Sequence, residues 1–264
     1  MKEISILGCG WLGLPLASSL VEKGFKVKGS TTSSDKHDLF LKKGILPYTI
    51  ELNENEIVGS IDSFLHTAEV LIIAIPPKLR KTNAENFVSK IKLLIPHLEH
   101  TQLTKILFIS STSVYGDQQI HVDENSPTMP ETESGKQLLE VEQLLQSKWA
   151  TTVLRFGGLI GPNRNPVYQL AGQKNIENPD APVNLIHLND CLEVIHTLLK
   201  KEFWGTTFNA VAPQHPSRKE YYIYKARSLG LPLPEFQLTN TSKGKIVQSK
   251  MLTELLDYSF TTEI

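Results

Sequence analysis

The chain has 264 residues, long enough for one large hydrophobic core or for a core with a small appended lobe. Its 40% hydrophobic and 21% charged residues are typical of a globular protein, and its net charge of −1 provides no basic surface for nucleic acid. No apolar run approaches the length of a membrane span, and the strand-like run from Ile4 leaves no room for a signal peptide. Cys9 and Cys191 lack metal-ligand spacing, so we expect two small buried thiols, no metal site and a cytoplasmic protein.

Apolar runs alternate with helical patterns through the first part of the chain. The runs that read as strands are Ile4–Leu7, Phe25–Gly29, Tyr48–Glu51, Val70–Ile75, Ile106–Ser110 and Thr152–Arg155. The helical patterns between them are Trp11–Glu22, Asp35–Lys43, Asn83–Leu98 and Lys136–Lys148. This alternation predicts an α/β fold of the Rossmann type, a doubly wound parallel sheet with helices on both faces.

The character of the sequence changes after Pro162, where prolines separate shorter elements. A helix at Asn189–Lys200 and a strand near Thr207–Asn209 are expected to return to the main sheet. We therefore predict an NAD(P)-binding Rossmann domain at residues 1–163, to which 189–210 return. Residues 164–188 and 211–264 would form a small C-terminal substrate lobe over the carboxyl ends of the strands, where open α/β sheets bind ligands.

The first strand ends in Gly8, Gly10 and Gly13, and a helix follows at once. In a dinucleotide-binding turn the first glycine permits the tight turn and the second lets the backbone approach a pyrophosphate. The third allows close packing of helix and strand, and the helix N-terminus offers free N–H groups. We predict cofactor binding at these glycines and at Trp11 and Leu12. An ordinary strand–helix turn is the alternative, because glycines are common in turns.

The end of the second strand bears on the choice of cofactor. NAD-specific folds usually place a carboxylate there, but Ser30, Thr31 and Thr32 carry hydroxyls and Lys36 follows. This pattern favours NADP, with NAD possible, and the alternative is a polar loop that caps the next helix. The ends of two central strands, Ala74-Ile75-Pro76 and Ser110, complete the predicted cofactor site.

The segment Phe108-Ile-Ser-Ser-Thr-Ser-Val-Tyr-Gly-Asp117 contains the end of the buried strand Ile106–Ser110 and the turn after it. Together with the glycine turn, Leu154–Pro162 and Asn184–Asp190, it resembles the extended and atypical short-chain dehydrogenase/reductases, the group of the NAD(P)-dependent epimerases and dehydratases. This resemblance implies that the hydroxyl of Ser111 binds and polarises a substrate oxygen, and that Tyr115 is structural. The alternative is that these serines only cap the strand.

The same resemblance implies a tyrosine, and a lysine four residues later, at the start of the next helix. No tyrosine lies between Tyr115 and Tyr168. If Lys136 is the family lysine, Thr132 takes the place of the tyrosine. In the ungapped register Ser134 takes it and Leu138 replaces the lysine, and this register matches more of the helix. We keep Ser134 and Lys136 as candidate catalytic residues. The lack of the pair resembles the atypical, YeeZ-like subgroup, for which NADP is the implied cofactor.

Other polar residues are further candidates. Lys78 and Arg80 follow a central strand and His187 lies near the predicted cleft, so these three are candidate substrate-binding residues. The alternatives are that Lys78 and Arg80 are ordinary solvated surface cations and that His187 is a core histidine with satisfied hydrogen bonds. We expect three tyrosines of the lobe to pack against its core. We expect four glutamates to lie at the start and on the solvated face of the helix after Pro130. These residues are Tyr221, Tyr222 and Tyr224, and Glu131, Glu133, Glu140 and Glu142.

These features predict an NADP-binding oxidoreductase or epimerase that acts on a polar carbonyl or hydroxyl compound such as a sugar nucleotide. The alternative is a non-catalytic NADP(H)-binding sensor or interaction protein, which would keep the glycine turn and lack the proton relay. A protein that binds another nucleotide is a third possibility, but it leaves the SSTSVYG segment unexplained. Relatives often form homodimers through two long helices, which here are Asn83–Leu98 and Lys136–Lys148.

Overall fold

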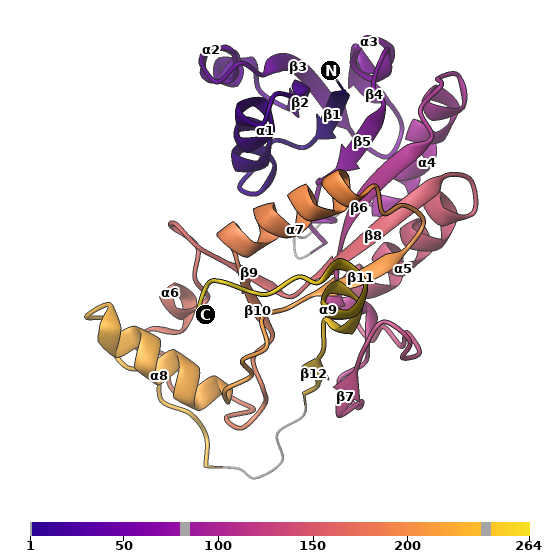
Figure 1. Ribbon diagram of the computed structural model, residues 1–264. Helices are drawn as coiled ribbons and strands as arrows, with labels where there is room; N and C mark the ends of the chain where they lie inside the picture. Colours follow the sequence, from indigo (N-terminus) through magenta and orange to yellow (C-terminus); the bar gives the residue numbers. More distant parts are fainter. Residues whose placement is uncertain (1, 80–84, 239–243) are drawn as a thin grey trace.

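The computed structural model describes residues 2–79, 85–238 and 244–264, and at its centre is an eight-stranded sheet (Figure 1). The strand order is β11-β8-β6-β5-β1-β2-β3-β4. In that order the strands are Thr207–Ala210, Ala150–Phe156, Lys105–Ser111, Val70–Ile73, Glu3–Leu7, Lys26–Thr31, Leu46–Leu52 and Ile57–Gly59. Every pairing is parallel except that of β4 with β3 at the edge. The predicted doubly wound α/β fold is therefore confirmed.

The central strands are buried on both faces, which is why their sequences are continuously apolar. In β1, Ile4 and Ile6 enter one hydrophobic cluster, whereas Leu7 enters the cluster on the other face. In β5, Val70 and Ile72 point one way and Leu71 and Ile73 the other. The twofold alternation of strand side chains thus builds two separate cores.

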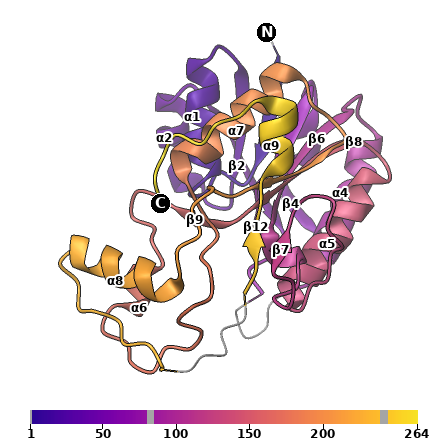
Figure 2. The same ribbon diagram turned by 60° about the horizontal axis from the view of Figure 1, so that its bottom comes forward.

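Helices cover both faces of the sheet (Figure 2). On one face lie α1, α2, α7 and α9, which are Gly13–Glu22, His37–Lys42, Leu188–Lys201 and Lys250–Leu256. On the other face lie α3, α4 and α5, which are Ile61–Leu65, Phe87–Glu99 and Glu133–Gln146. Short 3₁₀ turns occur at Ser34–Lys36 and Thr112–Val114. No helix in the described ranges is long and apolar enough to span a bilayer.

A smaller lobe lies beside the carboxyl ends of the strands and contains α6, α8, β9 and β10 (Figure 1). These elements are Val167–Leu170, Arg218–Ser228, Gly158–Ile160 and Leu185–His187, and a third hydrophobic cluster holds them together. A further short pair joins β7, His121–Val122, to β12, Ile246–Val247. Unlike the predicted boundary, α9 packs with the main body, because Leu252 and Leu256 enter the same cluster as α1 and α7.

Several predicted element ends differ from the structure. Strand β2 continues to Thr31, and β5 stops at Ile73 because the backbone leaves the sheet before Pro76. Helix α4 begins at Phe87, where the Asn86 side chain accepts a hydrogen bond from the amide of Ser89. The predicted start at residue 83 lies outside the described residues.

Helices α4 and α5 lie side by side, with Lys92 and Glu140 paired at 3.2 Å. Dimerisation through these two helices stays a prediction. Both cysteines are free and buried, as expected, and burial raises the pKa of Cys9 to about 12.

A buried ion pair corrects one prediction on α5. Glu142 was expected on a solvated face, but its side chain is 1% exposed and binds the guanidinium of Arg155 on β8 at 2.6 Å. Arg155 also donates to the hydroxyl of Tyr115 at 2.8 Å, and Ser110 donates to Glu142 at 2.5 Å. Burial opposes the charge of Arg155, but the Glu142 carboxylate outweighs it and raises the pKa of the guanidinium. The ion pair between Glu142 and Arg155 therefore joins α5 to the sheet through buried charged side chains.

We expect Glu142→Gln to lower the free energy of unfolding by about 3 kcal/mol, because it leaves the Arg155 charge buried without its counter-ion. Urea unfolding at neutral pH measures the change. The matched control is Glu140→Gln on the same helix, whose exposed pair with Lys92 contributes only about 0.5 kcal/mol. Equal effects of the two substitutions would contradict this account of the buried pair.

Candidate functional site

The turn from β1 to α1 has the tight geometry that its glycines predict. Gly8 has a φ of +102°, and a Cβ there would lie 2.7 Å from the side chain of Ile75. A Cβ on Gly13 would lie 2.2 Å from the carbonyl oxygen of Gly8, so this position excludes any side chain. A Cβ on Gly10 would meet nothing within 4 Å. Space therefore lies open at Gly10, on the side where a dinucleotide would approach.

The amides of this turn divide into two groups. Gly8 donates to the Ser30 hydroxyl and Cys9 to the Ser30 carbonyl, both at 2.8 Å. The amides of Trp11, Leu12 and Gly13 have no hydrogen-bond partner among the residues that the structure describes. They lie at the N-terminus of α1, where free N–H groups and the helix dipole attract anions. Together with the open space at Gly10, these donors fit the diphosphate of a dinucleotide.

The end of β2 differs in part from the prediction. The Ser30 side chain is buried and supports the glycine turn, so it is not free to bind a 2′-phosphate. Thr31 is also buried, and its hydroxyl accepts the amide of Ser33 at 3.3 Å. Thr32 and Lys36 are exposed. Only these two remain available from the predicted set.

The segment after β5 lies directly beside the glycine turn. The amide of Ala74 donates to the carbonyl of Leu7 at 2.9 Å, and Ile75 limits the space at Gly8. Pro76 and Lys78 are exposed, and Lys78 has a positive φ of 56°. These residues thus border the strand ends as predicted, whereas Arg80 lies outside the described residues.

Ser111 ends β6 in a cleft of about 570 Å³ between the carboxyl ends of β6 and β8 and the lobe. Its hydroxyl accepts the amide of Ser113 at 3.1 Å and caps the short turn that follows. The neighbouring Ser110 was predicted to bind cofactor, but its hydroxyl is bonded to Glu142 inside the fold. Of these two neighbouring serines, Ser111 is therefore the one whose side chain the cleft can use.

Three cations of the cleft were missed by the sequence analysis. Arg164 donates to the carbonyl of Leu159 at 3.1 Å, and its guanidinium lies 4.9 Å from the centre of the Trp11 ring. Arg218 donates to the carbonyl of Glu177 at 3.1 Å, and Lys245 forms an ion pair with Asp117 at 2.5 Å. Burial lowers the pKa of Arg164. Within the described ranges neither arginine is paired with a carboxylate, so both leave positive charge in the cleft.

The first turn of α5 holds no group that replaces the missing phenol. The Thr132 hydroxyl caps the helix by accepting the amide of Gly135 at 3.1 Å. Ser134 is half-buried, Lys136 is exposed, and neither lines the cleft at Ser111. Leu138 is buried in the core. Neither sequence register therefore yields a proton-relay pair.

The remaining candidates have structural partners. His187 caps α7 by accepting the amide of Asn189 at 3.2 Å, and burial lowers its pKa. It does not line the cleft that contains Ser111, as its predicted substrate role requires. Tyr221 and Tyr222 pack in the lobe, and burial raises the pKa of both, whereas Tyr224 is exposed.

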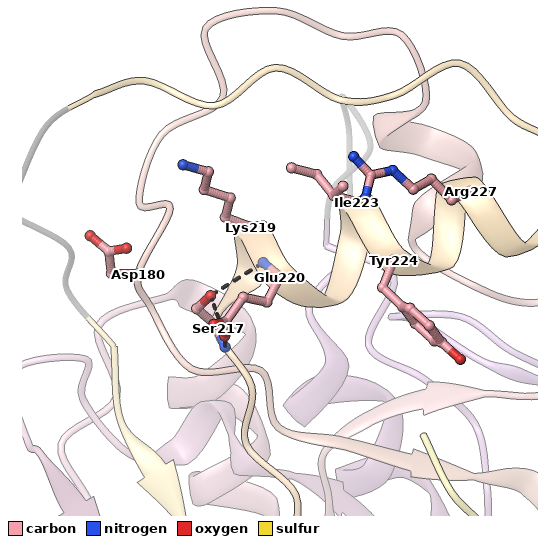
Figure 3. A pocket seen from close by; sticks show the side chains of 7 residues that line it. All are labelled: Asp180, Ser217, Lys219, Glu220, Ile223, Tyr224 and Arg227. Atoms are coloured by element: carbon pink, nitrogen blue, oxygen red, sulfur yellow. Dashed lines mark hydrogen bonds between the residues drawn. The ribbon is translucent and has the colours of Figure 1, made fainter.

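A second hollow of about 510 Å³ follows the surface of α8 (Figure 3). Lys219, Ile223 and Arg227 extend from one side of this helix and Tyr224 from another. Ser217 and Glu220 are joined in a capping box at its start. The side chains of a single exposed helix form most of this hollow, so the cleft at the strand ends is the better candidate site.

Comparison with known proteins finds similarity over the N-terminal part of the chain and over its whole length. A family model described as the NAD binding domain of 6-phosphogluconate dehydrogenase matches residues 3–126. Protein YeeZ of Escherichia coli (strain K12) is 37% identical over 265 residues, which cover 98% of this chain and 96% of YeeZ. The chain belongs to the YeeZ family. This family assignment confirms the predicted resemblance to the epimerase-like short-chain dehydrogenase/reductases.

More distant relatives agree with the YeeZ family's place in this fold group. A UDP-glucose 4-epimerase of Yersinia pestis is 27% identical over 175 residues, 58% of this chain and 52% of that protein. The crystal structure of UDP-glucuronic acid 4-epimerase from Bacillus cereus in complex with NAD superposes with a TM-score of 0.80 at 19% identity. It covers 99% of this chain and 92% of the epimerase. The N-terminal part of the chain is thus a nicotinamide-dinucleotide-binding domain.

We expect Gly10→Val to abolish dinucleotide binding and to leave the fold intact, because its side chain enters space that the protein leaves open. Calorimetric titration with NADPH and thermal unfolding measure the two effects. Gly13→Val is the matched comparison and should lower folding stability as well, since its Cβ collides with the Gly8 carbonyl. Undiminished affinity in Gly10→Val would refute the assignment of this turn.

Proposed function

We propose that the protein is an NADP(H)-dependent oxidoreductase or epimerase that acts on a polar carbonyl or hydroxyl compound, such as a sugar nucleotide. The observation that carries this proposal is the Ser111 hydroxyl, which opens into the same cleft as Arg164 and Arg218, two arginines that have no carboxylate partner among the described residues. A carbonyl or hydroxyl oxygen and an anionic group of one molecule would both find partners there. The named epimerases among the relatives support the substrate class.

The chain would bind the cofactor diphosphate through the free amides of Trp11, Leu12 and Gly13. When bound, the nicotinamide supplies hydride transfer. Ser111 Oγ would donate a hydrogen bond to the substrate oxygen and stabilise negative charge that develops on it. Arg164 lies over the Trp11 ring and so connects the cofactor turn to this cleft.

The preference for NADP rests on the residues that follow β2. No carboxylate occurs at Ser30–Thr32, and the exposed Thr32 and Lys36 supply a hydroxyl and a positive charge. Asp35 accepts a hydrogen bond from the Ser33 hydroxyl. At the end of β2 a 2′-phosphate would therefore meet the donors of Thr32 and Lys36.

We expect NADPH to bind more tightly than NADH, and Lys36→Glu to weaken NADPH binding about fivefold, as suits an exposed charge pair of about 1 kcal/mol. Fluorescence titration of the bound dihydronicotinamide measures both affinities. Lys42→Glu makes the same change of charge at the far end of α2 and should have a smaller effect. Tighter binding of NADH by the native protein would refute the NADP preference.

We expect Ser111→Ala to lower turnover of a sugar nucleotide about 100-fold, because one donor to the developing negative charge is lost. Its affinity for NADPH should stay within about twofold, since Ser111 holds the substrate and not the diphosphate. Ser113→Ala, which also removes a hydroxyl from the cleft, is the control. Tight NADPH binding without turnover of any sugar nucleotide would instead indicate a non-catalytic binding protein.

A further inference from the structure

Lys245 is a nearly buried lysine in the cleft of Ser111. Its side chain is 10% exposed, and its ammonium pairs with Asp117, two residues beyond Tyr115 of the Ser-Thr-Ser-Val-Tyr-Gly segment. Lysines are seldom buried, because moving an ammonium out of water costs free energy unless a partner compensates. The Asp117 side chain is 59% exposed and supplies that compensation from the rim. A charged amine is thus held inside the cleft.

The backbone of Lys245 is fixed against the end of β8. The Asn184 side chain donates to the carbonyl of Lys245 at 2.7 Å and accepts the amide of Val247 at 2.8 Å. The carbonyl of Asn184 in turn passes so close to Gly157 that a Cβ there would lie 2.7 Å from it. Lys245 therefore reaches the cleft from an anchored segment.

Few groups in this cleft can donate a proton to a substrate oxygen. The hydroxyls of Ser111, Thr112 and Ser113 titrate far above neutrality, and the guanidinium groups of Arg164 and Arg218 stay protonated. Asp117 and Lys245 remain, and Asp117 is the acceptor in their ion pair. Among the described residues that line the cleft, Lys245 is thus the group with a proton to give.

We propose that Lys245 exchanges the proton of the substrate oxygen in place of the tyrosine that α5 lacks, with Asp117 as its positioning residue. This inference rests on the proposed function. In the reducing direction Ser111 Oγ holds the substrate oxygen while hydride arrives at the adjoining carbon. An N–H bond of Lys245 breaks, its electron pair stays on Nζ, and the new O–H bond completes the alcohol. Water then returns a proton to the neutral amine, and oxidation reverses these steps.

Arg164 and Arg218, which have no carboxylate partner in the described part of the chain, complete the site by holding an anionic part of the substrate. Because Lys245 is already paired with Asp117, it adds no net charge, and its role differs from that of the arginines. Lys219, the next residue after Arg218, belongs to the hollow on α8 and not to this cleft (Figure 3). Lys219 is therefore a control for Arg218, because it is a neighbouring cation that lies outside the cleft.

Pyridoxal 5′-phosphate tests the site without any known substrate, since it carries both a carbonyl group and a phosphate. Its aldehyde condenses with an amine to an imine and water, and borohydride reduces the imine to a stable secondary amine that peptide mass spectrometry locates. We expect Lys245 to be modified about tenfold faster than Lys250, whose side chain is 49% exposed, because the cleft orients the aldehyde. Arg218→Gln should remove this advantage and Lys219→Gln should not.

Variants then separate proton transfer from charge. Lys245→Met and Lys245→Arg should both lower turnover of a sugar nucleotide at least about 100-fold, with NADPH affinity unchanged, because arginine keeps the charge but does not release a proton. Asp117→Asn should lower kcat, leave KM unchanged and accelerate modification of Lys245, since its ammonium loses a stabilising carboxylate. A structural role alone would not accelerate the labelling.

Modification of Lys245 no faster than that of Lys250, or full turnover by Lys245→Arg, would overturn the inference. Either result together with normal NADPH binding and a damaged Ser111→Ala variant would leave the proposed function standing. Absence of NADPH binding would refute the proposed function itself, and the labelling rates would still report whether Lys245 meets a carbonyl in the cleft.

Discussion

The close contact between the Gly8 carbonyl and Gly13 is the constraint on which the nucleotide end of the molecule depends. A Cβ on Gly13 would lie 2.2 Å from that oxygen, so α1 approaches β1 only because no side chain intervenes. The same turn contains the open space at Gly10 and the N-terminal amides of α1 that have no partner among the described residues. The Ser30 hydroxyl and carbonyl accept the amides of Gly8 and Cys9, which links the geometry of the turn to β2. The close approach of Gly13 to the Gly8 carbonyl thus determines both how α1 packs on β1 and where a dinucleotide can bind.

A buried cluster of polar side chains joins the elements behind the cleft of Ser111. Glu142, Arg155 and Tyr115 join α5 to β6 and β8, and the Tyr115 hydroxyl continues the chain by donating to Asn209 on β11 at 3.0 Å. Asn209 then donates to the carbonyl of Gln248 at 3.0 Å. Gln248 lies three residues beyond Lys245. One connected set of hydrogen bonds thus extends from the strand that ends in Ser111 to the segment that carries Lys245.

Local patterns predicted the fold but only part of the site. The apolar runs and the glycine spacing depend on residues close together in the sequence, so the sheet and its first turn could be predicted from them. Glu142 looked solvated because it lies among other polar residues of α5, and only the fold brings it to Arg155. The role of Ser30 was missed for the same reason, because its hydrogen-bond partner Gly8 is 22 residues away in the sequence. Arg164, Arg218 and Lys245 come from three separate lobe segments without a shared pattern, and their meeting is a property of tertiary structure.

The absence of the family's phenol is built into the packing of α5. A Cβ on Gly135 would lie 2.3 Å from the Ser113 carbonyl, so the helix meets the turn after β6 with no room for a side chain between them. Thr132 is occupied as the helix cap, and Leu138 is packed in the core. Ser134→Tyr would still have Leu138 in the place of the lysine. Thr132→Tyr would be paired with Lys136, which does not line the cleft of Ser111. In the function that we propose, a proton for the Ser111 side of the cleft would therefore come from another wall, and we assign this role to the lobe segment that contains Lys245.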